Sequence, residues 1–118
     1  MRAKDAVGQY GERVATAYLQ RAGWEVLDRN WRGADGEIDI VAVRAGELIV
    51  VEVKTRRGLG FGHPAEAVTA RKLARLRRLT AQWLAAHDAH PRSLRIDVIA
   101  VLVPRSGAAR VEHLVGVL

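Results

Sequence analysis

Residues 36–57 of the chain read GEIDIVAVRAGELIVVEVKTRR. Two runs rich in β-branched residues, 37–44 and 47–55, flank Ala45-Gly46, and this pattern predicts a β-hairpin. Charged side chains inside strands need a partner or a function, so they are the most informative feature of the hairpin. Four of them interrupt the apolar runs: Glu37, Asp39, Glu52 and Lys54.

The turn determines how these charged residues meet. A symmetric two-residue loop at Ala45-Gly46 pairs Arg44 with Glu47. Counting back along both strands then predicts two charged pairs: Asp39 opposite Glu52, and Glu37 opposite Lys54. Directly opposed side chains have Cβ atoms about 4.5–5.5 Å apart, so two carboxylates placed there repel each other.

Two arrangements relieve the repulsion between Asp39 and Glu52. One is a proton shared between the carboxyl groups, and the other is a divalent cation held by both. Ligands that are all oxygen suit Mg²⁺ or Mn²⁺.

A solvated sheet face is the third interpretation of these charges. Its ion pairs would each contribute about 0–1 kcal/mol. The same face continues toward the turn with four apolar residues: Val41, Val43, Leu48 and Val50. A face that is apolar at one end and charged at the other predicts a cleft edge, covered at the turn end and open beyond it.

The rest of the chain supplies two helices and further strands. Helix spacing over residues 6–22 predicts a first helix that Gly23 ends in a left-handed cap, with a buried face of Val7, Tyr10, Val14, Ala17 and Tyr18. A strand is expected to about Arg32, and a Gly-rich connection at 58–62 leads to a second helix. That helix is expected over 65–87, with a buried stripe of Leu73, Leu76, Leu79, Trp83 and Leu84. Strands follow at 95–103 and 111–115.

The element order is α-β-β-β-α-β(-β), which predicts a single α/β (α+β) domain over residues 1–118 with a mixed sheet. The chain has 118 residues and no cysteine, which excludes disulfides and thiolate zinc sites. With 19 Lys+Arg against 13 Asp+Glu the net charge is +6, which favours a nucleic-acid partner. No apolar run approaches the roughly 20 residues of a membrane span, and the first residues lack a secretory signal. We therefore expect a cytoplasmic protein with no membrane partner.

The charged hairpin residues also carry a family resemblance. Asp39, followed by Glu52-Val53-Lys54 on the next strand, resembles the Asp…Glu-x-Lys signature of the restriction-endonuclease-like nuclease superfamily. A wider ordered set, covering nearly the whole chain, resembles the YraN family of small bacterial predicted endonucleases. The set comprises Gly8, Gly11-Glu12, Leu19, Gly23, Asn30, residues 36–39 and 51–54, Arg56, and residues 95–100.

The resemblance implies a restriction-endonuclease-like mixed central sheet flanked by helices, with Glu12 from the first helix completing a metal site, as in archaeal-type Holliday junction resolvases. The implied catalytic residues are Glu12, Asp39, Glu52 and Lys54. The implied ligands of Mg²⁺ or Mn²⁺ are Asp39, Glu52, the Val53 backbone carbonyl and Glu12. Glu37 would position Lys54. Two plainer interpretations stay open: Glu12 as a helix-dipole partner or solvated residue, and Lys54 as a salt-bridge partner of Glu37.

The implied function is a metal-dependent endonuclease acting on DNA, with branched DNA as a candidate substrate and a homodimer as a candidate assembly. The alternative is a non-catalytic nucleic-acid-binding module that keeps the nuclease fold. Phosphate contacts are expected from Arg56 and Arg57 after the hairpin, and from a stripe along the second helix. The stripe consists of Arg71, Lys72, Arg75 and Arg78, for which a solvated helix face is the plainer interpretation.

Overall fold

A computed structural model of the chain describes residues 5–58 and 68–117. The elements in chain order are α1 (Ala6–Arg21), β1 (Glu25–Gly33), β2 (Gly36–Arg44), β3 (Glu47–Arg57), α2 (Ala70–His87), β4 (Ser93–Val103) and β5 (Arg110–Leu114). The strands form a sheet in the order β1-β2-β3-β4-β5. β3 and β4 are parallel and the other neighbours are antiparallel. The predicted order α-β-β-β-α-β-β and the mixed sheet are confirmed.

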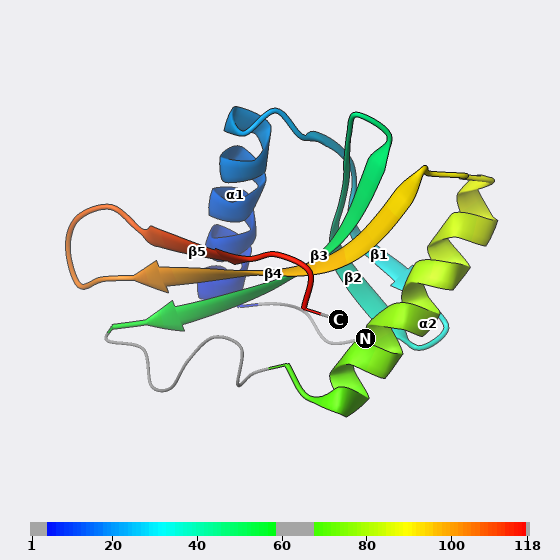
Figure 1. The fold of residues 1–118 in the computed structure, drawn as a ribbon. Helices are drawn as coiled ribbons and strands as arrows, with labels where there is room; N and C mark the ends of the chain where they lie inside the picture. Colours follow the sequence, from blue (N-terminus) through cyan, green and yellow to red (C-terminus); the bar gives the residue numbers. More distant parts are fainter. Residues whose placement is uncertain (1–4, 59–67, 118) are drawn as a thin grey trace.

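The two helices lie on opposite sides of the sheet (Figure 1). α1 contributes Ala15 and Leu19 to an apolar cluster, which we call the α1-side cluster. That cluster also contains Trp24, Ile40, Ala42, Ile49, Val51, Ile99 and Val101. The α2-side cluster contains Ile38, Val41, Leu48, Val50, Leu76, Leu79, Trp83 and Ile96. Within the described residues, neither helix is long and apolar enough to cross a membrane.

The buried face of α1 differs from the predicted one. Spacing favoured Val7, Tyr10, Val14, Ala17 and Tyr18, but the buried positions are Gly11, Glu12, Ala15, Thr16 and Leu19. The reason is a close approach between α1 and β3, where a Cβ atom on Gly11 would collide with the side chain of Thr55. No side chain fits at position 11, so α1 turns the face with Gly11, Ala15 and Leu19 toward the sheet, and Val14 and Tyr18 are only partly buried.

Gly23 ends α1 as predicted. It adopts φ 91°, its N–H donates to the Gln20 carbonyl at 3.1 Å, and the Trp24 N–H donates to the Leu19 carbonyl at 3.0 Å. This is the Schellman arrangement, which satisfies carbonyls at the helix end. Trp24 and Leu19 also pack in the same apolar cluster, so the cap fixes where β1 begins.

The start of α2 differs from the sequence prediction. The expected start at residue 65 and most of the Gly-rich connection lie outside the described residues. Residues 68 and 69 are not helical, and Thr69 is the N-cap, with its side chain accepting from the Lys72 N–H at 3.1 Å. The predicted apolar stripe of α2 is confirmed, since Leu76, Leu79 and Trp83 are buried.

The β2–β3 hairpin has the predicted two-residue turn. Ala45 and Gly46 both have positive φ, at 51° and 81°, as a type I′ turn requires. The ladder begins at Arg44 and Glu47 and continues in the predicted register to Ile40 and Val51.

The two predicted charged pairs lie beyond the end of this ladder. In the described chain, Ile40–Val51 is the last β2–β3 pair, so the expected strand pairs of Asp39 with Glu52 and of Glu37 with Lys54 are wrong. Glu37 instead lies opposite Arg32 in the β1–β2 ladder, with an ion pair of 3.9 Å. β3 continues past this point along β4 as far as Arg57 and Val103.

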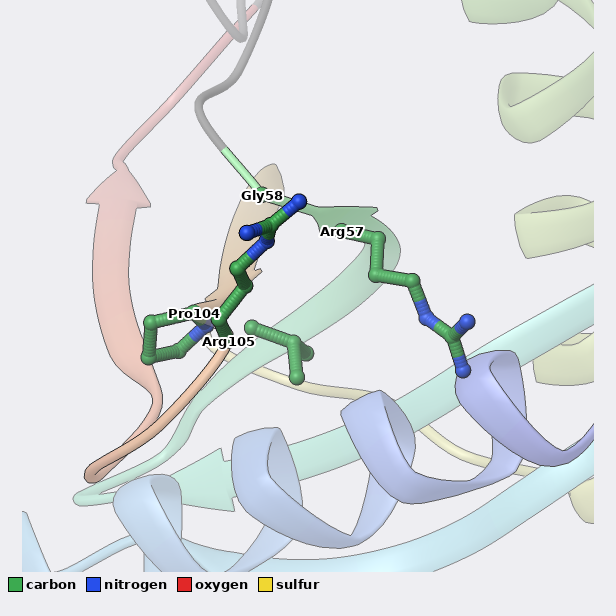
Figure 2. Close-up of a pocket in the computed structure, with 5 residues that line it drawn as sticks. Arg57, Gly58, Pro104 and Arg105 are labelled. Carbon is green, nitrogen blue, oxygen red and sulfur yellow. The ribbon is translucent and has the colours of Figure 1, made fainter.

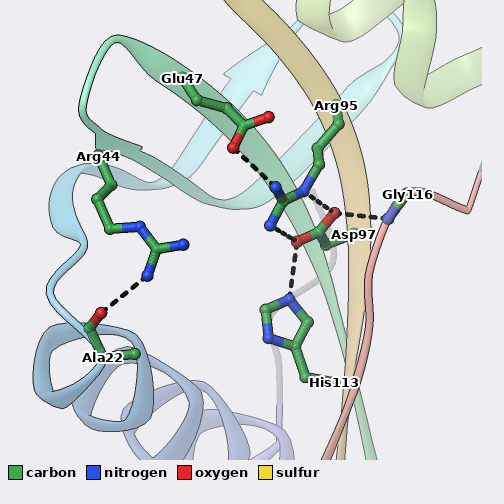
Figure 3. A network of polar contacts seen from close by, with 7 residues as sticks. All are labelled: Ala22, Arg44, Glu47, Arg95, Asp97, His113 and Gly116. Carbon is green, nitrogen blue, oxygen red and sulfur yellow. Dashed lines mark hydrogen bonds and ion pairs between the residues drawn. The ribbon is translucent and has the colours of Figure 1, made fainter.

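Asp97 on β4 is fully buried and holds a charged network together (Figure 3). Arg95 donates to both of its carboxylate oxygens at 2.9 and 3.1 Å, and reaches Glu47 on β3 at 2.8 Å. His113 Nε2 lies 2.7 Å from the carboxylate, and the Gly116 N–H donates to it at 2.9 Å. The network joins β3, β4, β5 and the segment after β5, so Asp97 has the structural role that an acid in an apolar strand suggests.

The Gly11–Thr55 contact predicts an unusual response to alanine. Gly to Ala in a helix normally stabilises by about 1 kcal/mol, but overpacking costs about 1–3 kcal/mol. We expect Gly11→Ala to lower the free energy of unfolding in urea, and Thr55→Gly to recover part of that loss in the double variant. A more stable Gly11→Ala protein would contradict the close packing.

The Asp97 network predicts a pH-dependent contribution to stability. Burial alone would raise the pKa of Asp97, but hydrogen bonds from His113, Arg95 and the Gly116 N–H outweigh it and hold that pKa below its ordinary value. The stabilisation is therefore present above the unfolded pKa, near 4, and is lost as the pH falls through the lower folded pKa. We expect Asp97→Asn to cost about 3 kcal/mol at neutral pH, because Arg95 and His113 lose the buried carboxylate that binds them both, although Arg95 keeps its ion pair with Glu47. Unfolding curves should show the two proteins converging in stability in strong acid, and a pH-independent difference would refute the network's role.

Candidate active site

The regular alternation of side chains between the two faces of β2 is interrupted at Asp39. Ile38 packs in the α2-side cluster and Ile40 in the α1-side cluster, although a regular strand would place both on one face. Between them, the Asp39 carboxylate extends toward β3, where Oδ2 accepts a hydrogen bond of 2.8 Å from the Val53 N–H. The side chain therefore binds a strand N–H just past the last ladder pair.

An open pocket of about 620 Å³ lies at this point, between the ends of β2 and β3 and the start of α1; we call it the site pocket. It brings together seven residues predicted from the sequence: Glu12, Glu37, Asp39, Glu52, Val53, Lys54 and Arg75. The pocket lies at the end of the hairpin away from the turn, so the predicted cleft edge is confirmed.

Five carboxylates line the site pocket, and we call three of them, Glu12, Asp39 and Glu52, its acidic side. Glu12 and Asp39 are each 7% exposed, and Glu52 is half-buried. Burial and the neighbouring Asp39 carboxylate raise the pKa of Glu52 to about 7. The positive charges of Arg75, Lys54 and Lys72 act in the opposite direction and lower the pKa of Glu52 in part. Near neutral pH Glu52 therefore carries a proton for part of the time or favours a bound cation, and each state relieves the repulsion expected from the sequence.

Lys54 and Arg75, which line the site pocket, and Lys72, whose ammonium lies near Lys54, form what we call the basic side. Burial, followed by the nearby Lys72 ammonium, lowers the pKa of Lys54. Arg75 lines the pocket, and its Nε atom is buried with no hydrogen-bond partner in the described part of the chain. Clustered cations with an unsatisfied donor are unfavourable by themselves and favour an anion between them.

The basic residues predicted to contact phosphate have separate surroundings. Lys72 and Arg75 are half-buried beside Glu52, whereas Arg71 is exposed. Arg78 forms a 3.5 Å ion pair with Asp35 in the β1–β2 turn. Lys72 and Arg75 thus lie together near Glu52, while Arg71 and Arg78 are exposed, and phosphate contact by these four residues stays a prediction. Arg56 is half-buried near Lys54, and Arg57 lies outside the site pocket.

The β1–β2 turn attaches α2 to the site. Gln82 accepts from the Ala34 N–H at 3.0 Å and donates to Asp35 at 2.9 Å. Sequence reasoning missed this attachment and missed Arg32, which also lines the site pocket. A signal for Arg32 was present, because a turn at 33–36 places it opposite Glu37.

The donor chemistry of the acidic side fits a hard divalent cation. Asp39 and Glu52 offer carboxylate oxygens, and a cation would remove the repulsion that contributes to the raised pKa of Glu52. Among the residues the structure describes, no group of three or more His, Asp or Glu side chains is close enough to form a complete metal site. A cation at this site would therefore be bound by two carboxylates, Asp39 and Glu52. Main-chain oxygen, water or substrate would supply the remaining ligands, as is usual for Mg²⁺.

Comparisons with known proteins find a matching family and distant structural similarity. A model described as uncharacterised protein family UPF0102 matches residues 11–101. A UPF0102 protein of Beutenbergia cavernae is 67% identical over 99% of both chains, and one of Kineococcus radiotolerans is 60% identical over 99% of this chain and 97% of its own. Archaeoglobus fulgidus Hjc, a Holliday junction resolvase from an archaeal hyperthermophile, is 20% identical with a TM-score of 0.47, covering 89% of this chain and 75% of that chain.

The proximity of two carboxyl groups makes a spectroscopic prediction. The pKa of Glu52, followed by carbon-13 NMR of its carboxyl group, should lie near 7 and should fall in Asp39→Asn, because the neighbouring charge is removed. Glu47→Gln serves as the control, since Glu47 lies at the turn end of β3 and should leave the titration of Glu52 unchanged. A Glu52 titration that is the same in wild type and Asp39→Asn would contradict the geometry.

Proposed function

The chain belongs to the UPF0102 family, whose YraN-like members its motif residues resemble, and from that premise we propose that it is a metal-dependent endonuclease that hydrolyses phosphodiester bonds in DNA. One observation carries the proposal: two mutually repelling carboxylates, Asp39 and Glu52, share a pocket with Lys54 and Arg75. Acidic groups suited to a cation, beside basic groups suited to an anion, are what phosphodiester hydrolysis requires.

Asp39 and Glu52 would hold Mg²⁺ or Mn²⁺, with the Val53 carbonyl as a further ligand and Glu12 completing the acidic side. When bound, the cation supplies Lewis-acid stabilisation of the phosphate and lowers the pKa of water. The Val53 N–H keeps the Asp39 carboxylate fixed at the strand end, so Asp39 is oriented before any ligand binds. This preorganisation reduces the cost of assembling the site.

Lys54 has the properties of a proton-transfer group. Its lowered pKa increases the fraction of neutral amine, which can accept the proton of the attacking water as the water oxygen bonds to phosphorus. The P–O bond to the leaving sugar oxygen then breaks, and that oxygen takes a proton from solvent. Glu52, on the same strand face, raises the pKa of Lys54 in part and keeps its ammonium group near the carboxylates.

Arg75 would contact the phosphate itself. Its buried Nε lacks a partner in the described residues, and a phosphate oxygen would satisfy it. Lys72 adds positive charge beside Lys54. Glu37 lies opposite Arg32 at the pocket wall, so it would orient Arg32, and a role in positioning Lys54 stays a prediction.

One observation favours the alternative of a non-catalytic DNA-binding module. The carboxylates of the described chain do not form a ready group of three around a cation. In that case the basic side would still bind phosphate, and the acidic side would be a remnant with no turnover.

Cleavage of a DNA panel separates the two functions. We expect Mg²⁺- or Mn²⁺-dependent cutting of at least one substrate among linear duplex, single-stranded, flapped and four-way DNA. Asp39→Asn and Lys54→Ala should each lower kcat at least 100-fold, because each removes a group acting on the reacting atoms. The exposed carboxylate variant Glu25→Gln, remote from the pocket, is the control and should keep full activity.

Two results would contradict the nuclease proposal. One is the absence of cleavage of every substrate at all concentrations of both metals. The other is cleavage that persists in Asp39→Asn, which would indicate a contaminating enzyme. DNA binding without cleavage, unaffected by Asp39→Asn, would favour the accessory module.

A further inference from the structure

A second pocket lies where β3 and β4 end together. Its volume is about 480 Å³, and it is lined by Arg57, Gly58, Val103, Pro104 and Arg105. Arg57 and Val103 are paired across β3 and β4, and the Gly58 N–H donates to the Val103 carbonyl at 2.8 Å. Both arginines therefore project from strand ends that are held together by main-chain hydrogen bonds.

The second pocket connects to the site pocket through shared residues. A third hollow, of about 470 Å³, is lined by Arg57 together with Thr55 and the first residues of α1. Asp5, Val7 and Thr55 line both this hollow and the site pocket, while Arg57 lines both this hollow and the second pocket. The three spaces therefore adjoin one another beside the end of β3, with the hollow between the site pocket and the second pocket.

The chemistry of the second pocket suits a phosphate diester with its sugar and base. Figure 2 shows Arg57 extending from the end of β3 toward α1, and Arg105 extending toward Gly58. Neither guanidinium has an ion pair or hydrogen bond with another described residue, so both can bind an incoming anion. Val103 and Pro104 provide apolar surface between them, against which a sugar or base can pack.

We propose that Arg57 and Arg105 form a second phosphate site, which holds the DNA strand after it leaves the site pocket. This inference rests on the proposed function, because the site pocket determines where the strand begins. A DNA strand that fills both pockets must be longer than the scissile dinucleotide, because the hollow beside Thr55 separates the two pockets. The proposal assigns substrate binding to Arg105, a residue outside the Asp…Glu-x-Lys motif.

Salt-dependent binding tests the second site without requiring catalysis. Fluorescence anisotropy with a labelled 20-base-pair DNA duplex in EDTA would compare wild type with Arg57→Ala/Arg105→Ala. Each lost phosphate contact lowers the slope of log K against log salt by about 0.9, so we expect a decrease of about 2 and an affinity loss of about tenfold or more. Arg57→Lys/Arg105→Lys keeps the charges and should keep the slope. The control is Arg21→Ala/Arg29→Ala, which removes two exposed charges that line none of the three spaces and should change the slope less.

The outcomes distinguish this inference from the proposed function. An unchanged slope in the alanine variant would overturn the second site even if the wild type cleaves DNA, and so would an equal loss in the control. Tighter binding of an RNA duplex through the same two arginines would overturn the assignment to DNA. If the wild type cleaves nothing with Mg²⁺ but the alanine variant loses affinity and slope as expected, the second site stands and the nuclease proposal fails.

Discussion

The hydrogen bond from the Val53 N–H to the Asp39 carboxylate is the contact on which the site depends. It lies where the β2–β3 ladder ends and β3 continues along β4. A buried N–H left without a partner costs about 1–3 kcal/mol, so a side-chain acceptor allows the two strands to part at low cost. The site pocket lies at this parting, and the same contact keeps Asp39 near Glu52, where its charge adds to the effect of burial in raising the pKa of Glu52.

The sequence predicted the hairpin and its turn because loop length and positive-φ positions are local properties. It did not predict the strand pairing of the charges, since counting back from the turn assumes an uninterrupted ladder. Ile38 and Ile40 face opposite sides of the sheet because the Asp39 side chain, instead of the β2 main chain, binds the Val53 N–H. That contact joins residues on two strands and cannot be read from either strand alone. The predicted buried face of α1 was wrong for a similar reason: spacing rules do not foresee the approach of Thr55 to Gly11, which turns the face with Gly11, Ala15 and Leu19 toward the sheet.

The positive charge of the chain has several roles, which its total of +6 does not distinguish. Arg95 and Arg78 are paired with acids of the fold, Asp97 and Asp35. Lys54, Lys72 and Arg75 surround Glu52 on the side of the pocket where a phosphate would lie. The family resemblance identified the acidic residues of the site, and the packing of α2 against the β1–β2 turn decides which basic residues can reach them.

Whether Asp39 and Glu52 hold a divalent cation is tested most directly by diffraction from crystals soaked in Mn²⁺, using the anomalous signal of the metal. The geometry predicts a peak in the site pocket, in contact with both carboxylates, that is lost in Glu52→Gln crystals. A soaked crystal with no anomalous peak in that pocket, or with a peak that persists unchanged in Glu52→Gln, would contradict a metal-dependent site.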